Sequence, residues 1–238
     1  MAPDRDAAFG RVDTIRDQNI DEGLRAYMLG VYNYMGAGLA ISGIIAFFTS
    51  NSPALMNAIY NSGLYWPVML APMGIIIAMM VGIKKMKAST IQFLYWAFVA
   101  INGLSLSFVF LLYTSASITR VFFITAATFG AMSLYGYTTK RNLTGIGPFL
   151  FMGLIGIIIA SVVNFFMASA MMEFAISVIG VLIFVGLTAY DTQRIRNEYS
   201  EMDSTEIATK KSVFGAVSLY LDFINLMLFL LRLFGDRR

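Results

Sequence analysis

Seven hydrophobic segments follow one another along this chain, separated by short polar stretches. Each segment is about 20 residues long, the length that an α-helix needs to cross the hydrocarbon core of a bilayer. The pattern therefore predicts an all-α integral membrane protein with seven transmembrane helices. The expected spans are 27–48, 66–83, 91–113, 118–138, 146–167, 172–192 and 212–234.

The segments that flank the spans at the two ends of the chain are charged. Residues 1–26 hold four arginines and six acidic residues. We expect a cytoplasmic tail over 1–26, a membrane domain over 27–234 and a short basic tail over 235–238. The first tail lacks the basic, apolar and small-residue order of a cleaved signal peptide, so the first span should be retained. A short interfacial helix over 13–25 is an alternative for the tail.

Lysine and arginine are distributed unevenly between the two sides. The N-terminal tail and the loops after the second, fourth and sixth spans hold thirteen of them, and the remaining segments hold four. Cytoplasmic loops are enriched in these residues, which predicts a cytoplasmic N-terminus. Arg232, Arg237 and Arg238 then fall on the outer side, so a re-entrant last helix with a cytoplasmic tail is the alternative topology.

Small residues recur at helical spacing in the first and fifth spans, and such faces allow close helix packing. We expect these faces to lie against neighbouring helices; they comprise Gly36, Ala40 and Gly43, and Gly153, Gly156 and Ala160.

Composition excludes several functions. The chain is 58% hydrophobic and 13% charged, and it contains neither cysteine nor histidine. It therefore has no thiol nucleophile, no histidine general base and no imidazole metal ligand. We expect no enzyme activity, no nucleic-acid partner and no tightly bound cofactor. An intramembrane aspartyl protease is formally open because two aspartates are available, although its usual flanking motifs are missing.

Two aspartates lie within or beside the last two hydrophobic segments. Charged groups at such positions are costly and mark function by default. Asp222 lies ten residues into the last expected span, on a polar helical face with Ser218 and Asn225, and Asp191 ends a similar face that includes Thr188. Two close carboxyls would share a proton, which indicates a proton or cation path. Alternatively, Asp191 only caps its helix near Arg194.

The expected depths of the two aspartates differ. Asp191 falls near the cytoplasmic end of its span, whereas Asp222 lies roughly 15 Å along the last expected helix. Contact between them requires the last helix to begin further into the cytoplasm, or a water cavity between them.

The motifs Ala189-Tyr-Asp-Thr-Gln-Arg-Ile195 and Tyr220-Leu-Asp-Phe-Ile-Asn-Leu226 resemble the Bax inhibitor-1 family (transmembrane Bax inhibitor motif proteins) in its bacterial branch, as does Lys85-Met-Lys-Ala-Ser-Thr90. The resemblance implies a bacterial inner-membrane protein with helix 7 at the centre of helices 1–6. It also implies a pH-sensitive calcium leak gated by a di-aspartyl sensor, here Asp191 and Asp222, which would bind Ca²⁺ weakly.

The chain departs from the family pattern at the second span. Family members often carry an arginine near the end of helix 2 that pairs with the helix 6 aspartate in the closed state. Here that helix ends Val81-Gly-Ile-Lys-Lys-Met86, and Lys84 and Lys85 are the nearest cations. A lysine ammonium does not reproduce a bidentate guanidinium. The candidate support residues for the gate are Lys84, Lys85, Thr188, Ser218 and Asn225.

Two functions remain in view. The first is a pH-gated calcium leak or exchanger, in which Ca²⁺ and protons are the transported or sensed ions. The second is a non-transporting regulator that binds other membrane proteins. The resemblance links bacterial relatives to a membrane-bound AAA protease and eukaryotic relatives to suppression of cell death.

Overall fold

The hydrophobic segments form long helices in the computed structural model, which describes the backbone of residues 5–238 and the side chains of residues 22–238. Within that part of the chain, seven helices are long and apolar enough to cross a membrane. This confirms the predicted all-α membrane fold. The elements are α1 (Arg5–Ser50), α2 (Pro53–Tyr60), α3 (Tyr65–Gly82), α4 (Ala88–Leu112), α5 (Ser115–Thr138), the 3₁₀ turn η1 (Thr144–Ile146), α6 (Gly147–Met167), α7 (Ala170–Asn197) and α8 (Thr205–Phe234).

The helices extend beyond the hydrophobic segments that predicted them. α7 continues to Asn197, and α8 begins at Thr205, seven residues before the expected start. Ser204 caps α8, because its side chain accepts a hydrogen bond from the backbone N–H of Ile207 at 3.3 Å. Such a cap satisfies one of the free N–H groups of the first helical turn. The loop between α7 and α8 is therefore shorter than the hydropathy pattern indicated.

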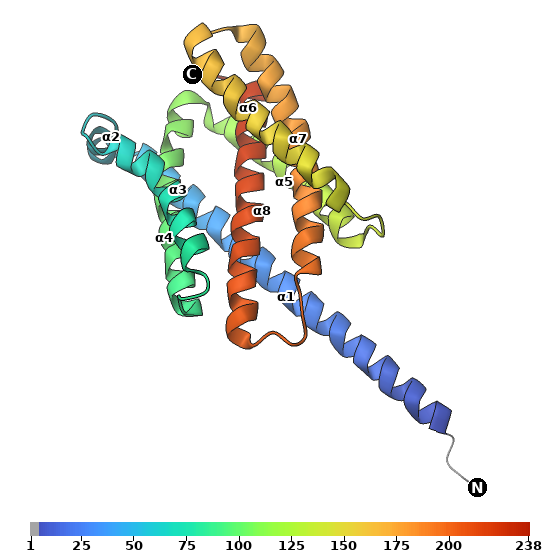
Figure 1. Cartoon of the computed structure of the whole chain (residues 1–238). Helices are drawn as coiled ribbons and strands as arrows, with labels where there is room; N and C mark the ends of the chain where they lie inside the picture. Colours follow the sequence, from blue (N-terminus) through green and yellow to red (C-terminus); the bar gives the residue numbers. More distant parts are fainter. Residues whose placement is uncertain (1–4) are drawn as a thin grey trace.

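α1 is one continuous helix of 46 residues. It runs through the segment expected to form a tail, and its N-terminal part projects away from the other helices (Figure 1). The alternative of a separate helix over 13–25 does not match this backbone, although the side chains before residue 22 lie outside the described residues. At the far end of α1, the short helix α2 fills a connection that the sequence did not predict as helical.

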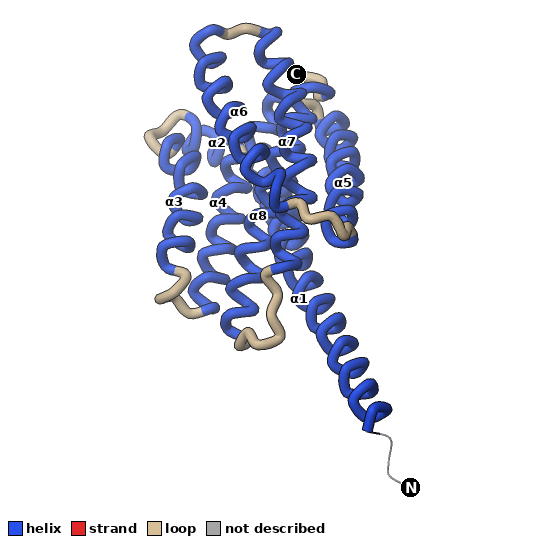
Figure 2. Tube along the Cα trace, turned by 45° about the vertical axis from the view of Figure 1, so that its right-hand side comes forward, coloured by secondary structure: helices blue, strands red, loops and turns tan. Residues whose placement is uncertain are grey.

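α8 is the most buried of the seven long helices, with 72% of its most apolar segment inside the protein. It packs against α1, α4, α5 and α7, whereas α3 packs against α4 and α6 against α7. The expectation of helix 7 at the centre of six helices is therefore not confirmed as a complete ring. α3 and α6 are peripheral, since neither packs against α8 in the described structure, and α3 lies at one edge of the bundle in Figure 2.

Close packing uses different glycines from those predicted. A Cβ atom on Gly36 or Gly43 would meet no atom within 4 Å, so the expected packing of this face of α1 is wrong. Helices instead approach closely at Gly136 of α5, where a Cβ atom would lie 2.2 Å from the carbonyl oxygen of Ala189 on α7. In α6, Gly153 packs against Ile183 as predicted, whereas Gly156 faces open space.

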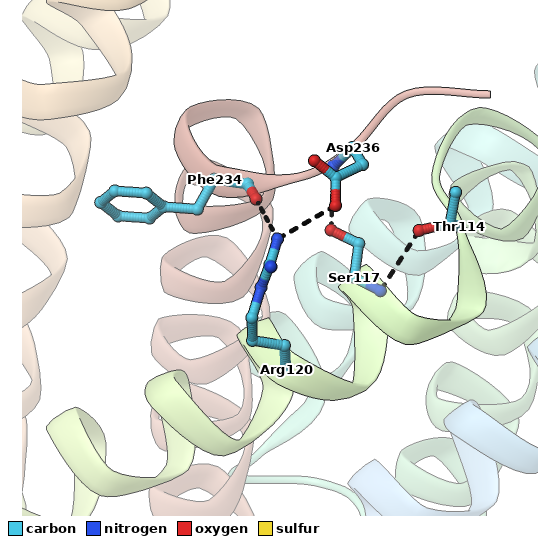
Figure 3. A network of polar contacts seen from close by, with 5 residues as sticks. All are labelled: Thr114, Ser117, Arg120, Phe234 and Asp236. Carbon is cyan, nitrogen blue, oxygen red and sulfur yellow. Dashed lines mark hydrogen bonds and ion pairs between the residues drawn. The ribbon is translucent and has the colours of Figure 1, made fainter.

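The C-terminal segment is fastened to the start of α5 (Figure 3). Arg120 Nη2 donates to the carbonyl oxygen of Phe234 at 2.9 Å and to Asp236 Oδ2 at 3.1 Å. The backbone N–H of Asp236 donates to Ser117 Oγ at 2.9 Å, and Arg237 pairs with Glu173 near the start of α7. We call these contacts the C-terminal clasp.

The clasp places the end of α8 beside the start of α7, so the two helices form a full antiparallel hairpin. At about 1.5 Å per residue, the 30 residues of α8 are long enough to cross a bilayer. The arrangement does not match a re-entrant last helix. It also pairs two charges of the C-terminal tail, because Asp236 contacts Arg120 and Arg237 contacts Glu173.

Candidate functional site

The α7–α8 hairpin brings Asp191 and Asp222 together. Both side chains line one groove and are buried, with relative exposures of 8% and 4%. The two residues lie close together because α8 begins at Thr205 rather than at Ser212, so Asp222 lies further along its helix than the hydrophobic segment implied. The early start of α8 thus removes the difference in depth that the hydrophobic segments implied.

One oxygen of this pair is not satisfied. Asp222 Oδ2 is buried and has no hydrogen-bond partner among the described residues. A buried polar atom without a partner costs free energy, and such an atom in a membrane helix calls for an explanation. The carboxyl of Asp191 is its neighbour, so a proton or a cation between the two carboxyls would give Asp222 Oδ2 a partner.

The two aspartates open onto a groove of about 1000 Å³ between α6, α7 and α8. We call it the aspartate groove. Its walls on the α6 side are apolar, and its polar side chains come mainly from α7 and α8. It reaches from Gly147, at the start of α6, to Arg232, near the end of α8. The polar and charged side chains that line it are Ser161, Tyr190, Asp191, Arg194, Ser218, Asp222, Asn225 and Arg232.

Arg194 is the cation nearest to the pair. Its Nη2 lies 3.2 Å from Asp191 Oδ1 and donates to Ser218 Oγ on α8 at 3.0 Å. Its Nε lies 3.7 Å from Glu198 Oε1. The guanidinium therefore spans α7 and α8 at one end of the aspartate groove. From the sequence, Arg194 was considered only as a neighbour of Asp191 in a possible helix cap.

The residues that follow Asp191 fasten α7 to its other neighbours. Thr192 Oγ1 and Ser133 Oγ of α5 lie 3.0 Å apart. Gln193 Oε1 accepts from the backbone N–H of Leu143 at 2.7 Å, and Gln193 Nε2 donates to the carbonyl oxygen of Arg141 at 2.8 Å. The motif around Asp191 is thus a junction that positions one carboxyl between α5, α8 and the α5–α6 connection. Sequence reasoning did not assign these roles to Thr192 and Gln193.

The candidate support residues divide into two groups. Ser218 and Asn225 line the aspartate groove with the two aspartates. Thr188 is buried outside the groove lining and donates to the carbonyl oxygen of Phe184 at 2.7 Å. Lys84 and Lys85 lie in the turn between α3 and α4, and neither lines the groove. The cation beside Asp191 is Arg194, rather than Lys84 or Lys85.

The donor set is poor for a tightly held metal. Within the described residues, no group of three or more acidic, histidine or cysteine side chains could hold a metal ion. Two carboxyls with nearby Ser and Asn oxygens suit transient contact with a hard cation that prefers oxygen ligands.

Residues 24–238 match the sequence pattern of the family described as inhibitor of apoptosis-promoting Bax1. The chain belongs to the Bax inhibitor-1 family. This is a family of membrane proteins rather than enzymes, and it is the family that the motifs around Asp191 and Asp222 resemble.

Bacterial relatives of this family are similar along almost their whole length. The inner membrane protein YbhL of Escherichia coli (strain K12) is 45% identical over 233 residues, covering 97% of this chain and 99% of the relative. The uncharacterized protein RP147 of Rickettsia prowazekii (strain Madrid E) is 46% identical over 225 residues, covering 94% and 95%. This Bax inhibitor-1 family protein thus has an inner-membrane relative, and the described part of its chain has seven helices long and apolar enough to cross a membrane.

Proposed function

We propose that this protein is a pH-sensitive calcium leak in which Asp191 and Asp222 form the proton-sensing gate. The observation that carries the proposal is the buried pair itself: two carboxyls that line one groove inside a helical bundle, one of them with an oxygen that has no partner among the described residues. The pair lies in a groove that covers much of the height of the bundle. The proposal also places the N-terminus in the cytoplasm.

Charge and contacts assign different states to the two carboxyls. Arg194 lies 3.2 Å from Asp191 and favours a negative charge there. Asp222 has no cation so close, and an uncharged carboxyl tolerates an unpartnered oxygen better than a carboxylate does. In the closed state, Asp222 therefore carries the proton and donates it to the Asp191 carboxylate.

Loss of this proton would drive opening. When the pH rises, the proton leaves and two negative charges face each other in a region of low dielectric constant. The repulsion favours separation of α7 and α8 and admits water from the aspartate groove. The added negative charge also attracts Ca²⁺. Because only two carboxyls are present, Ca²⁺ passes through the site rather than being retained.

Calcium flux into liposomes tests the gate. Purified protein is reconstituted, and Ca²⁺ entry is followed with an internal dye at a series of pH values. The wild type should conduct more as the pH rises. Asp222→Asn keeps the shape but removes the titrating group, so the flux should lose its pH dependence. Asp191→Asn should have the same effect on the pH dependence.

The matched control is Glu173→Gln, which also replaces a carboxyl by an amide on α7 but lies outside the aspartate groove. Its pH profile should follow the wild type. Each variant is first shown to elute as a monodisperse species in detergent. A well-folded Asp222→Asn protein with the pH profile of the wild type would reject the gate.

A second candidate is a membrane regulator that binds other membrane proteins, such as a membrane-bound AAA protease, without transporting ions. The projecting N-terminal part of α1 favours it, because that segment extends beyond the other helices (Figure 1). Deletion of residues 1–24 separates the two functions. A regulator would lose its cellular effect while flux in liposomes remained unchanged, whereas a leak would depend on the aspartates and not on this segment.

A further inference from the structure

A second groove lies on another face of the bundle, between α1 and α5. These two helices do not pack directly along their length; both pack against α7 and α8. A hydrogen bond of 2.6 Å between Tyr32 and Ser133 joins them across the floor of the gap. The space above has a volume of about 600 Å³. We call it the α1–α5 groove.

The walls of this groove are apolar and face outward. Leu29 of α1 and Leu134 of α5 are 52% and 63% exposed, whereas Met28 and Phe129 form part of its buried base. In a protein that spans a bilayer, such walls contact lipid chains. An apolar surface alone does not identify the ligand of the groove. The chemistry of its polar end is therefore needed to choose one.

The polar end carries a cation that the rest of the described structure does not neutralise. Arg25 is exposed, lines the α1–α5 groove beside Tyr137, and has no acidic partner among the described side chains. Behind Tyr137, Arg196 donates to its carbonyl oxygen and likewise has no acidic partner within the described residues. One guanidinium, that of Arg25, thus lines the end of an apolar groove, and a second, that of Arg196, contacts the backbone of the lining residue Tyr137.

A separate apolar hollow of about 530 Å³ lies further along α1, on its small-residue face, against Phe122 and Phe223. No atom lies within 4 Å of the Cβ positions of Gly36 and Gly43 there. Beyond the α1–α5 groove, this face of α1 is therefore also open and apolar.

We propose that the α1–α5 groove binds one anionic phospholipid from the leaflet on the N-terminal side. Its phosphate contacts Arg25, which can donate two parallel hydrogen bonds to phosphate oxygens, and Arg196 adds positive charge nearby. One acyl chain lies between Leu29 and Leu134 in the α1–α5 groove. Basic pockets between transmembrane helices are suited to anionic headgroups in this way. A transmembrane helix of a partner would leave the arginines without an anion at this depth.

Native mass spectrometry of the full-length protein in detergent tests the site. The probes are phosphatidylglycerol and phosphatidylcholine with identical acyl chains, added at increasing concentration. We expect one tightly retained phosphatidylglycerol per protein and weaker retention of phosphatidylcholine. Arg25→Gln should weaken phosphatidylglycerol binding about tenfold, the size expected for loss of a charge-assisted hydrogen bond.

Two further variants separate the groove from general surface charge. Lys84→Gln removes an exposed cation in the turn between α3 and α4 that has no ion-pair partner among the described side chains, and it should leave binding unchanged. Gly130→Leu fills the α1–α5 groove without changing the charge, and its Cβ position is open because no atom lies within 4 Å. This variant should fold normally and lose phosphatidylglycerol.

Three results would overturn the proposal. Equal losses in Arg25→Gln and Lys84→Gln would indicate non-specific attraction to charge. Retention of phosphatidylglycerol by a well-folded Gly130→Leu protein would place the lipid elsewhere. A wild-type dimer that Gly130→Leu converts to a monomer would show that a second copy of the chain, rather than a lipid, occupies the groove.

Discussion

Arg194 Nη2 lies 3.2 Å from Asp191 Oδ1, one helical turn away on α7. The same nitrogen donates to Ser218 on α8. One guanidinium therefore links Asp191 to the helix that carries Asp222. In the proposed gate, Arg194 does locally what the resemblance assigned to an arginine on the second span.

Arg194→Gln should move the rise of Ca²⁺ flux to higher pH. Without the cation, the carboxyl pair loses its nearest opposite charge. It should therefore hold its shared proton up to a higher pH. We expect a shift of roughly one pH unit, measured as the midpoint of flux against pH in liposomes. Arg194→Lys preserves the charge and should shift the midpoint less. The prediction fails if Arg194→Gln and the distant Lys84→Gln have the same midpoint as the wild type.

Gly136→Ala should destabilise the protein because α5 and α7 cross too closely for a side chain. The new Cβ atom would lie 2.2 Å from the carbonyl oxygen of Ala189, and overpacking of this kind costs about 1–3 kcal/mol. Gly130→Ala is the control on the same helix, since its Cβ would meet nothing within 4 Å. The control should be neutral or stabilising by up to about 1 kcal/mol.

Thermal unfolding in detergent compares the two alanine variants. The wild type should lie between them or level with Gly130→Ala. If Gly136→Ala unfolded at the same temperature as Gly130→Ala, the close crossing of α5 and α7 would be incorrect.

The Arg237–Glu173 pair of the C-terminal clasp should contribute little to stability and should not respond to alkaline pH. Hydrogen bonding to Glu173, with a smaller contribution from Tyr113, raises the pKa of Arg237 above its ordinary value. A raised pKa means that the stabilisation is present below the unfolded-state pKa and is lost only as the pH rises through the folded-state pKa. For arginine, both lie far above neutrality.

The free energy of unfolding of Arg237→Gln should therefore differ from the wild type by about 0.2–1 kcal/mol, as for other exposed ion pairs, and by the same amount at pH 7 and pH 10. Arg237→Lys provides the matched comparison, because an ordinary lysine loses its charge near pH 10.4. Its contribution should be present below about pH 10.4 and should be lost as the pH rises beyond that value. A difference between wild type and Arg237→Gln that disappeared by pH 10 would contradict the assignment.

Hydropathy predicted the spans well, because the cost of placing polar residues in lipid limits where each helix can cross. It could not predict where the helices end outside the lipid. α8 begins at Thr205, in a segment with Glu206, Lys210 and Lys211 that reads as a polar loop. Ser204 is a local signal for a helix start at this point, but the residues that follow it have no hydrophobic pattern that would predict a helix. The missing turns of α8 were the reason why the two aspartates had seemed to differ in depth.

Glycine spacing predicted close packing but not the partner of each face. The face of α1 that holds Gly36 and Gly43 fits the pattern and yet is open, whereas Gly38, two residues from Gly36, approaches Tyr95. Which face of a helix meets a neighbour depends on how all seven helices are arranged, and a single span does not contain that information. The spacing of Arg194 one turn after Asp191 was visible in the sequence, although its bond to Ser218 was not.

α8 has the most buried apolar segment of the long helices in the described structure, and it packs against α1, α4, α5 and α7. Before α8 inserts, α1 can already pack against α4, and α5 against α7, but these two helix pairs have few contacts with each other. Insertion of the earlier spans should therefore yield an open intermediate in which Asp222 has not yet reached Asp191. Entry of α8 between the two pairs would then close the bundle and complete the aspartate pair in one step.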